Sequence, residues 1–242
     1  MKKHACPEQT QYGFTLVEMA MVLLIITVLL AGLVPTISSQ MEQQHTNETR
    51  KKMSEIKEAL IGYAMRNGKL PCSADPAKTL GQSGWGTERS PCTAATRYGV
   101  VPWVTLGTSE TDGWGNRFTY HVTLTFADST DGTGASCATT TGISFQLCSN
   151  GEIVIFSDAS ETTTVANNIP AIIISHGKNG AGAYTPQGTQ RPAGSTDEQE
   201  NIDYSTDFKY VSRLPTSSFD DLVEWITPNI LANRMVAAGK LP

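Results

Sequence analysis

An acidic side chain lies inside the first apolar stretch of the chain, which is an unusual place for a charge. The stretch runs from Phe14 to Val34 and carries Glu18 near its start. At a helical rise of about 1.5 Å per residue it reaches roughly 31 Å, the thickness of a bilayer core. A carboxylate at helix-centre depth costs about 2.5–3.5 kcal/mol, and acids in such segments are usually functional and paired. No Lys, Arg or His occurs in the stretch, so Glu18 either lies at the headgroups or finds its partner elsewhere.

A cut between Gly13 and Phe14 would supply that partner, because it creates a new amine on Phe14. One helical turn separates Phe14 from Glu18, so the two charges can meet within one chain. They can equally meet between chains, with Glu18 of one subunit holding the Phe14 amine of the next. In that second arrangement the pair sets the register in which subunits stack.

The residues that flank the apolar stretch indicate its orientation. Lys2 and Lys3 precede it and only Glu8 opposes them, so the positive-inside rule places the N-terminus in the cytoplasm and the rest of the chain outside. A cleaved secretory signal is the alternative, with a poor cleavage site at residues 30–32. The apolar stretch is longer than is usual for such signals.

The segment Gly13-Phe14-Thr15-Leu16-Val17-Glu18, with its basic leader and apolar run, resembles the processing signature of type IV prepilins and pseudopilins. Pro35 matches the proline that commonly kinks the pilin helix. The resemblance implies that a membrane aspartyl peptidase removes residues 1–13 and N-methylates Phe14, and that Glu18 serves methylation and assembly. It also implies a bacterial inner-membrane protein with a cytoplasmic N-terminus and a periplasmic head, which then enters a pilus, a pseudopilus or the cell surface.

This resemblance gives the primary functional hypothesis, a structural subunit of a type IV pilus or a type II secretion pseudopilus that assembles through its hydrophobic helix. The implied partners are a prepilin peptidase and methyltransferase, other pilin or pseudopilin subunits, and an inner-membrane assembly platform. The alternative is a minor pilin at a filament tip that binds a surface, an exported substrate or DNA. A third and weaker class is an ordinary single-pass periplasmic protein with an uncut N-terminus.

Composition and motifs disfavour other classes of protein. The chain has 18 Lys and Arg against 23 Asp and Glu, which is not the basic footprint of a nucleic-acid-binding protein. The four histidines are not accompanied by a nucleophile-elbow, zincin or phosphate-loop motif, and Cys-x-x-Cys is absent. We therefore expect neither a nucleic-acid partner for the filament subunit nor enzyme activity.

The cysteines indicate an oxidising compartment for the head. Five are present, and four remain if the leader with Cys6 is removed. An even set in an exported domain is typical of two disulfides. Sequence proximity favours Cys72–Cys92 and Cys137–Cys148, although four cysteines allow three pairings and free buried thiols are the alternative.

The helix that starts in the apolar stretch is expected to continue as an amphipathic half. Met53, Ile56, Leu60 and Ala64 recur at helical spacing, and Asn67-Gly68 is a stop signal. Pro35 removes one backbone donor and is expected to kink or loosen the helix. The expected domains are a leader at 1–13, a membrane-spanning half helix at 14–34, an amphipathic half at 35–66 and a globular head at 67–242.

The head is expected to be loop-rich, with an antiparallel sheet of about four strands packed on the long helix and a helix at the C-terminus, which makes the fold class α+β. Asn150-Gly151 between two apolar runs predicts a hairpin. The strand at 171–175 is expected to be buried on both faces. The predicted strands cover residues 117–126, 143–148, 152–156 and 171–175.

Short stretches of the head resemble loops of the major pseudopilins of type II secretion. Residues 112–116 resemble their Asp-Pro-Trp-Gly-Asn turn, with Gly113 where proline is usual, and residues 175–180 resemble the loop after their last core strand. Those proteins bind calcium in an acidic loop at the place of residues 196–207, where carboxylates two to four residues apart can wrap Ca²⁺. Solvated acids without an ion are the alternative. The calcium ligands that the resemblance implies are Asp197, Glu198, Asp203 and Asp207.

The C-terminal region is expected to be helical in two pieces. Ser218 with Asp221 three residues later resembles a capping box for a helix over residues 219–226. Thr227-Pro228 can start a second helix, with threonine as N-cap and proline at the first position, and Gly239 would end it.

Overall fold

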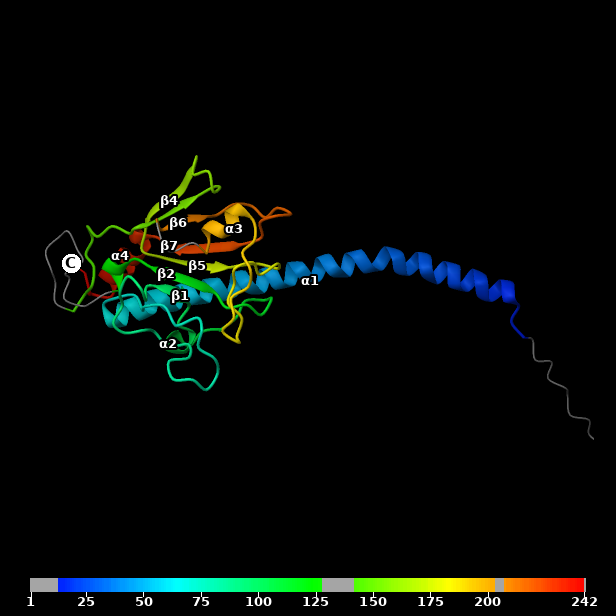
Figure 1. Cartoon of the computed structure of the whole chain (residues 1–242), viewed down its shortest axis with the longest axis horizontal. Helices are drawn as coiled ribbons and strands as arrows, with labels where there is room; N and C mark the ends of the chain where they lie inside the picture. Colours follow the sequence, from blue (N-terminus) through cyan, green and yellow to red (C-terminus); the bar gives the residue numbers. More distant parts are fainter. Residues whose placement is uncertain (1–12, 128–141, 203–206, 242) are drawn as a thin grey trace, which may run out of the picture. The chain divides into compact units, whose positions relative to one another are not determined.

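The structure is a computed structural model that describes residues 13–127, 142–202 and 207–241, without the side chains of residues 30–38. The chain forms two compact units, Met1–Gln43 and Gln44–Pro242. The elements, drawn in Figure 1, are α1 (Leu16–Asn67), β1 (Tyr98–Val100), α2 (Trp103–Leu106), β2 (Thr119–Val122), η1 (Leu124–Phe126), β3 (Ile153–Phe156), β4 (Thr164–Ile169), β5 (Ala171–Ser175), α3 (Thr196–Glu200), β6 (Lys209–Val211), β7 (Leu222–Ile226) and α4 (Pro228–Ala237).

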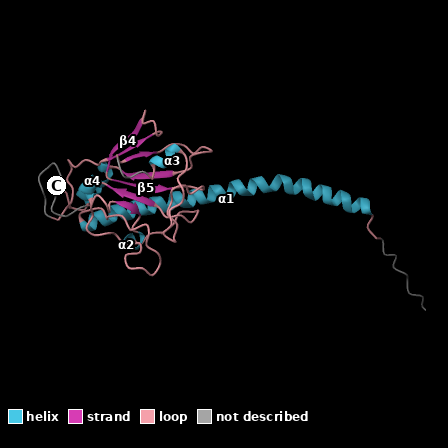
Figure 2. Cartoon of the chain, in the orientation of Figure 1, coloured by secondary structure: helices cyan, strands magenta, loops and turns pink. Residues whose placement is uncertain are grey.

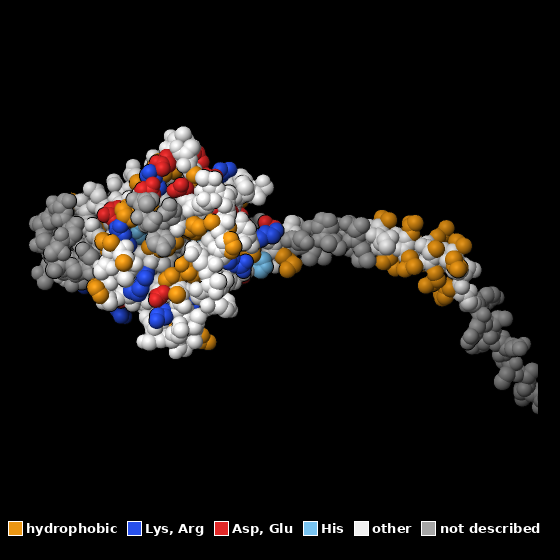
Figure 3. Space-filling view, viewed as in Figure 1, with side chains coloured by type: hydrophobic (Ala, Val, Ile, Leu, Met, Phe, Trp, Pro, Cys, Tyr) orange, Lys and Arg blue, Asp and Glu red, His pale blue; other side chains and the backbone are white. Residues whose placement is uncertain are grey.

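The first part of α1 presents apolar side chains to its surroundings, and these are coloured orange in Figure 3. Among the residues and side chains that the structure describes, no helix is both long enough and apolar enough to cross a membrane. The membrane span expected at 14–34 stays a prediction. The helix is continuous across Pro35, and the kink expected there stays a prediction.

The second part of α1 carries the apolar face that its sequence predicts. Met53, Ile56, Leu60 and Ala64 are all buried in the main core of the second unit. The helix ends at Asn67, and Gly68 follows with a left-handed φ of 74° while its N–H donates to the Ala64 carbonyl at 2.8 Å. This confirms the predicted stop signal, because a left-handed residue that closes the last turn is the usual glycine C-cap.

In the described part of the second unit, seven strands form two sheets (Figure 2). The larger sheet is antiparallel throughout and has the order β1-β2-β5-β7. The smaller sheet has the order β4-β3-β6, with β3 antiparallel to β4 and parallel to β6. The predicted α+β class is confirmed, but one antiparallel sheet of about four strands describes only the larger sheet.

The two faces of the larger sheet are covered by different layers. Apolar side chains of α1 and α4 pack with one face, and Leu231 and Met235 bring α4 into that core. On the other face, Ile172 and Ile174 of β5 pack with Ile153 and Ile155 of the smaller sheet. All five residues of β5 are buried, as predicted for a strand covered on both sides.

One predicted strand does not exist and another is longer than the strand that the structure has. Residues 143–148 form no strand, so the hairpin predicted at Asn150-Gly151 does not exist; β3 pairs instead with β4 and β6. The strand predicted at 117–126 is shorter, because β2 ends at Val122 and the turn η1 follows. Ile143 and Phe145 are still buried in the main core, so the apolar pattern marked burial rather than a strand.

The C-terminal prediction is half right. The first predicted helix, over residues 219–226, is wrong: this segment contains β7, which pairs with β5 along its whole length. The second is confirmed as α4, with Thr227 at the N-cap position, Pro228 in the first turn and Gly239 just beyond its end.

Candidate functional site

The start of α1 holds Glu18 in a reciprocal contact with Thr15. Glu18 Oε2 accepts hydrogen bonds from the Thr15 backbone N–H at 2.9 Å and from its hydroxyl at 2.8 Å. The Glu18 N–H donates in turn to Thr15 Oγ1 at 3.2 Å. This is the geometry of a capping box, in which a threonine and a glutamate three residues later satisfy donors of the first helical turn.

The Thr15 contact was missed by the sequence reasoning, although its signal was present as Thr-x-x-Glu before an apolar run. It gives Glu18 a local partner while Phe14 is still in a peptide bond. Both contacts to Thr15 use Oε2, which leaves Oε1 for a second donor. Gly13 is exposed, and a Cβ added there would meet nothing within 4 Å.

The turn at residues 112–116 ties the second part of α1 to the sheet. Asp112 Oδ1 accepts hydrogen bonds from the backbone N–H groups of Trp114 and Asn116, each at 2.9 Å, and its Oδ2 accepts one from the Ser175 hydroxyl at 2.7 Å. Burial raises the pKa of Asp112, and these hydrogen bonds oppose that rise.

Gly113 meets α1 at close range. Its N–H donates to Thr49 Oγ1 at 2.9 Å, and a Cβ at this position would lie 2.6 Å from the His45 carbonyl oxygen. A proline could not make the hydrogen bond, because it has no N–H. The pseudopilin turn usually has proline at the position of Gly113. In this chain the glycine N–H makes a hydrogen bond to α1 that a proline could not make.

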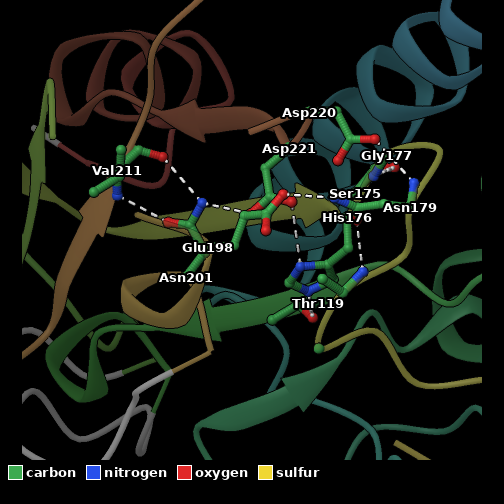
Figure 4. Close-up of polar contacts among 12 residues, drawn as sticks. Thr119, Ser175, His176, Gly177, Asn179, Glu198, Asn201, Val211, Asp220 and Asp221 are labelled. Carbon is green, nitrogen blue, oxygen red and sulfur yellow. Dashed lines mark hydrogen bonds and ion pairs between the residues drawn. The ribbon is translucent and has the colours of Figure 1, made fainter. Parts of the chain in front are cut away.

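A buried polar cluster follows β5 (Figure 4). His176 is fully buried; its Nε2 is 2.8 Å from the Thr119 hydroxyl and its Nδ1 is 3.6 Å from Asp221 Oδ1. The order threonine, histidine, aspartate resembles a hydrolase relay, but Thr119 is only 1% exposed. A substrate could not reach its hydroxyl, so the arrangement fixes the β2, β5 and β7 ends rather than performing chemistry.

Three carboxylates gather beside this histidine. Glu198 comes from α3, and Asp220 and Asp221 come from the turn before β7; one oxygen of each lies within 4.8 Å of the others. Burial raises the pKa of Asp220, and the charges of Asp221 and Glu198 raise it further. Among the residues that the structure describes, these three carboxylates are the group of side chains whose ligand atoms lie close enough together to hold one metal ion.

The acids predicted from the pseudopilin resemblance are not brought together in this way. Asp197 forms an ion pair with Arg213 and accepts a hydrogen bond from the Ala159 N–H at 2.9 Å. Asp207 pairs with Lys209 at 3.0 Å. Glu198 belongs to the cluster described above, and Asp203 lies outside the described residues. The calcium assignment to these four side chains stays a prediction.

The disulfide predictions are answered in part. Cys72 and Cys92 form a disulfide, as predicted. Cys148 is also disulfide-bonded, and its predicted partner, Cys137, lies outside the described residues. The bond between Cys72 and Cys92 closes the long loop region before β1 and staples it to the core, in which both cysteines are buried.

Comparison with known families bears on the N-terminal site. Residues 9–34 match the family model described as the prokaryotic N-terminal methylation motif. The chain carries a type IV pilin-like prepilin signal. No curated protein and no solved structure matches the chain.

The prepilin signal contains Gly13, Phe14 and Glu18, and its match ends one residue before Pro35. Proteins with this signal are structural pilin subunits rather than enzymes. A prepilin signal implies processing by a prepilin peptidase and assembly with other pilins. The signal covers the start of the chain, so it does not describe the head.

Proposed function

We propose that this prepilin is a structural subunit of a type IV pilus or a type II secretion pseudopilus. Residues 14–34 anchor it in the inner membrane, with the N-terminus in the cytoplasm and residues 67–242 in the periplasm. A prepilin peptidase cuts between Gly13 and Phe14 and N-methylates Phe14. An assembly platform in the inner membrane then adds the subunit to a filament, whose core is formed by the α1 helices of neighbouring subunits.

The match of residues 9–34 to the methylation motif carries this proposal. The contacts of Glu18 add a physical reason for the order of events. Before the cut, Thr15 holds Glu18 through Oε2. After the cut, the Phe14 amine lies one helical turn from Glu18 and can approach Oε1 of its own chain or of a neighbour. A cation beside this carboxylate offsets the cost of keeping it in lipid, and a contact between chains fixes their register.

The head suits an exported filament subunit because its hydrophobic cores are made of residues of the second unit. Its core combines α1, α4 and two sheets, and the disulfide between Cys72 and Cys92 holds the long loop that has little regular structure. Such bonds persist in oxidising compartments such as the periplasm.

A recognition subunit at a filament tip is the second candidate. The observation that favours it is β4, an outer strand of the smaller sheet whose residues from Thr164 to Asn168 are largely exposed. An exposed edge strand offers main-chain groups to a partner. The position of the protein along purified filaments distinguishes the two roles, because a body subunit is found throughout and a tip subunit only at one end.

The experiment that tests the proposed processing replaces Gly13 with leucine. The variant is expected to keep its leader and to stay out of filaments, as measured by the mass of the protein and by its recovery in sheared filaments. A side chain at position 13 meets nothing in the fold, so a defect would reflect recognition by the peptidase. Gly62→Ala is the matched control, because a Cβ at Gly62 also meets nothing within 4 Å. Normal trimming of the Gly13→Leu chain would refute the assigned cut.

A further inference from the structure

The sequence contains three Asn-Gly dipeptides, at residues 67–68, 150–151 and 179–180. Asparagine followed by glycine is prone to spontaneous deamidation, because the unhindered and flexible glycine nitrogen can reach the side-chain carbonyl carbon of the asparagine. In a folded protein the reaction depends on how firmly the asparagine amide and the glycine N–H are held. The structure holds these two groups very differently in the three dipeptides.

The third dipeptide, in the loop after β5, is fixed on both sides. The Asn179 side-chain N–H donates to Glu198 Oε1 at 2.7 Å, and its Oδ1 accepts a hydrogen bond from the Ala181 N–H at 2.8 Å. The Gly180 N–H, whose nitrogen would be the nucleophile, donates to the His176 carbonyl at 3.0 Å. Both reacting groups are therefore held by other partners.

The first dipeptide, at the end of α1, is fixed in the same way. The Asn67 side-chain N–H donates to the Tyr63 carbonyl at 2.9 Å. The Gly68 N–H donates to the Ala64 carbonyl at 2.8 Å and so closes the last turn of the helix. Attack of the Gly68 nitrogen on the Asn67 side chain would have to break both hydrogen bonds and open the helix end.

The second dipeptide is free on both sides. Asn150 is exposed, and within the described chain neither its side-chain amide nor the Gly151 N–H has a hydrogen-bond partner. Gly151 itself packs closely, because a Cβ there would lie 2.3 Å from the Ile169 carbonyl oxygen. The ring that deamidation forms contains atoms of Asn150 and the Gly151 nitrogen but not the Gly151 Cα. The packing of Gly151 therefore leaves the exposed Asn150 side chain free to turn.

We propose that Asn150 is a site of spontaneous deamidation in the folded head, and that Asn67 and Asn179 are protected from it. The Gly151 nitrogen gives its proton to water or hydroxide and attacks Asn150 Cγ. A bond forms between these two atoms, the bond from Cγ to the side-chain nitrogen breaks, and that nitrogen takes up a proton and leaves as ammonia. Water then opens the cyclic imide at either carbonyl carbon and leaves aspartate or isoaspartate. Water is the only co-reactant.

The reaction places a negative charge on an uncharged part of the head. Asn150 lines a hollow between β4 and the start of α4, and the described residues that line it include no Lys, Arg, His, Asp or Glu. Isoaspartate also lengthens the main chain just before β3, where Gly151 packs against Ile169. Aged subunits therefore differ from new ones in the charge and the shape of this face, whichever filament role the protein has.

The test follows the three sites in the full-length processed protein, kept folded in neutral buffer with detergent for several weeks. Protease fragments that separate the sites are analysed by mass spectrometry at intervals, and the first sample corrects for deamidation during digestion. Asn150 is expected to react at least about tenfold faster than Asn67 or Asn179, because those two must first break hydrogen bonds. Equal retention of the amide at all three sites, or faster loss at Asn67 or Asn179, would overturn the proposal.

A control in unfolded protein separates the effect of the fold from that of the dipeptide. With the disulfides reduced and the chain unfolded in guanidinium, all three sites lose the contacts described above. Asn67 and Asn179 are then expected to react at rates similar to that of Asn150. If the preference for Asn150 persists unchanged in the unfolded chain, the flanking sequence selects the site and the structural reasoning fails.

A variant control uses Asn150→Gln, which keeps an amide but closes the corresponding larger ring far more slowly. The exposed side chain has no partner to lose, so the variant is expected to fold as the original protein does. Ion-exchange chromatography of the aged original protein should show a new acidic form that the aged variant lacks. An acidic form that appears in the variant at the original rate would place the modification elsewhere.

Discussion

His121 is expected to make the head less stable in mild acid. Its side chain is 1% exposed, and its Nδ1 is 2.6 Å from the Tyr210 hydroxyl. Burial and, to a smaller extent, the nearby Arg97 guanidinium together lower the pKa of His121 from 6.5 to about 3. As the pH falls from 6.5 toward about 3, the imidazole of the unfolded chain takes up a proton. The same imidazole in the folded head stays neutral over this range.

The sign and size of the effect follow from proton linkage. Because the folded pKa lies below the unfolded one, stability is full above pH 6.5 and falls as the pH drops from 6.5 toward the folded value. One pKa unit corresponds to about 1.36 kcal/mol, so this single group should cost about 2 kcal/mol between pH 7 and pH 5. The folded pKa hardly enters this difference in stability, because pH 5 lies well above it.

The assay is urea unfolding of the processed protein, followed by tryptophan fluorescence at both pH values. His121→Gln is the comparison, because glutamine does not titrate and can still hydrogen-bond to Tyr210. The difference in unfolding free energy between pH 7 and pH 5 should be about 2 kcal/mol smaller in the variant. Equal differences in the two proteins would show that His121 is not held neutral, and the reasoning from its burial would fail.

Two further predictions concern the assembly residue and the contact of α1 with the turn at 112–116. Glu18→Ala should leave the chain in the membrane but sharply reduce its share of sheared filaments, as measured by immunoblotting, and normal incorporation would count against a role in register. Gly113→Ala should destabilise the head by about 1–3 kcal/mol in urea unfolding, because its Cβ would lie 2.6 Å from the His45 carbonyl oxygen. The control Gly62→Ala should cost nothing, and an equal effect of both changes would show that close approach is not the cause.

The helical rod was predictable from the sequence because its signals are local. The spacing of Met53, Ile56, Leu60 and Ala64 defines the buried face, and Asn67-Gly68 defines the end. The same is true of β5, whose continuous apolar run matches a strand buried on both faces. Each of these segments has a pattern that one kind of structure satisfies much better than another.

The segment before α4 was misassigned because short apolar runs are ambiguous between helix and strand. Leu222, Val223, Trp225 and Ile226 fit either structure, and pairing with β5 decides for the strand. Asp221 was taken for part of a capping box, but it is buried and contacts Asn201 and His176 instead. Tertiary contacts overrode the local signal here.

The hairpin at Asn150-Gly151 failed for a related reason. Gly151 lies against the backbone of Ile169, where a Cβ would come within 2.3 Å, so the glycine permits a close approach between segments rather than a two-residue turn. The outer strand β4 was missed because half of its residues are polar and most are exposed, which leaves no alternating pattern to detect.

The N-terminal site was predictable and the carboxylate cluster was not. Gly13, Phe14 and Glu18 are neighbours in the chain, so their spacing is visible in the sequence. Glu198 and the acid pair before β7 lie more than twenty residues apart, and they meet through Asn179 in the loop after β5, which contacts both Glu198 and Asp220. The sequence also did not show which of the four acids implied by the pseudopilin resemblance would form an ion pair with a lysine or an arginine.

The mass of the N-terminal peptide of the mature protein is the most direct test of the account, measured in cells with an active prepilin peptidase. The account predicts a chain that begins at Phe14 and carries one methyl group on its amine. A native chain that still begins at Met1 would contradict it, because Glu18 would then have no cation to meet and the proposed assembly contact could not form.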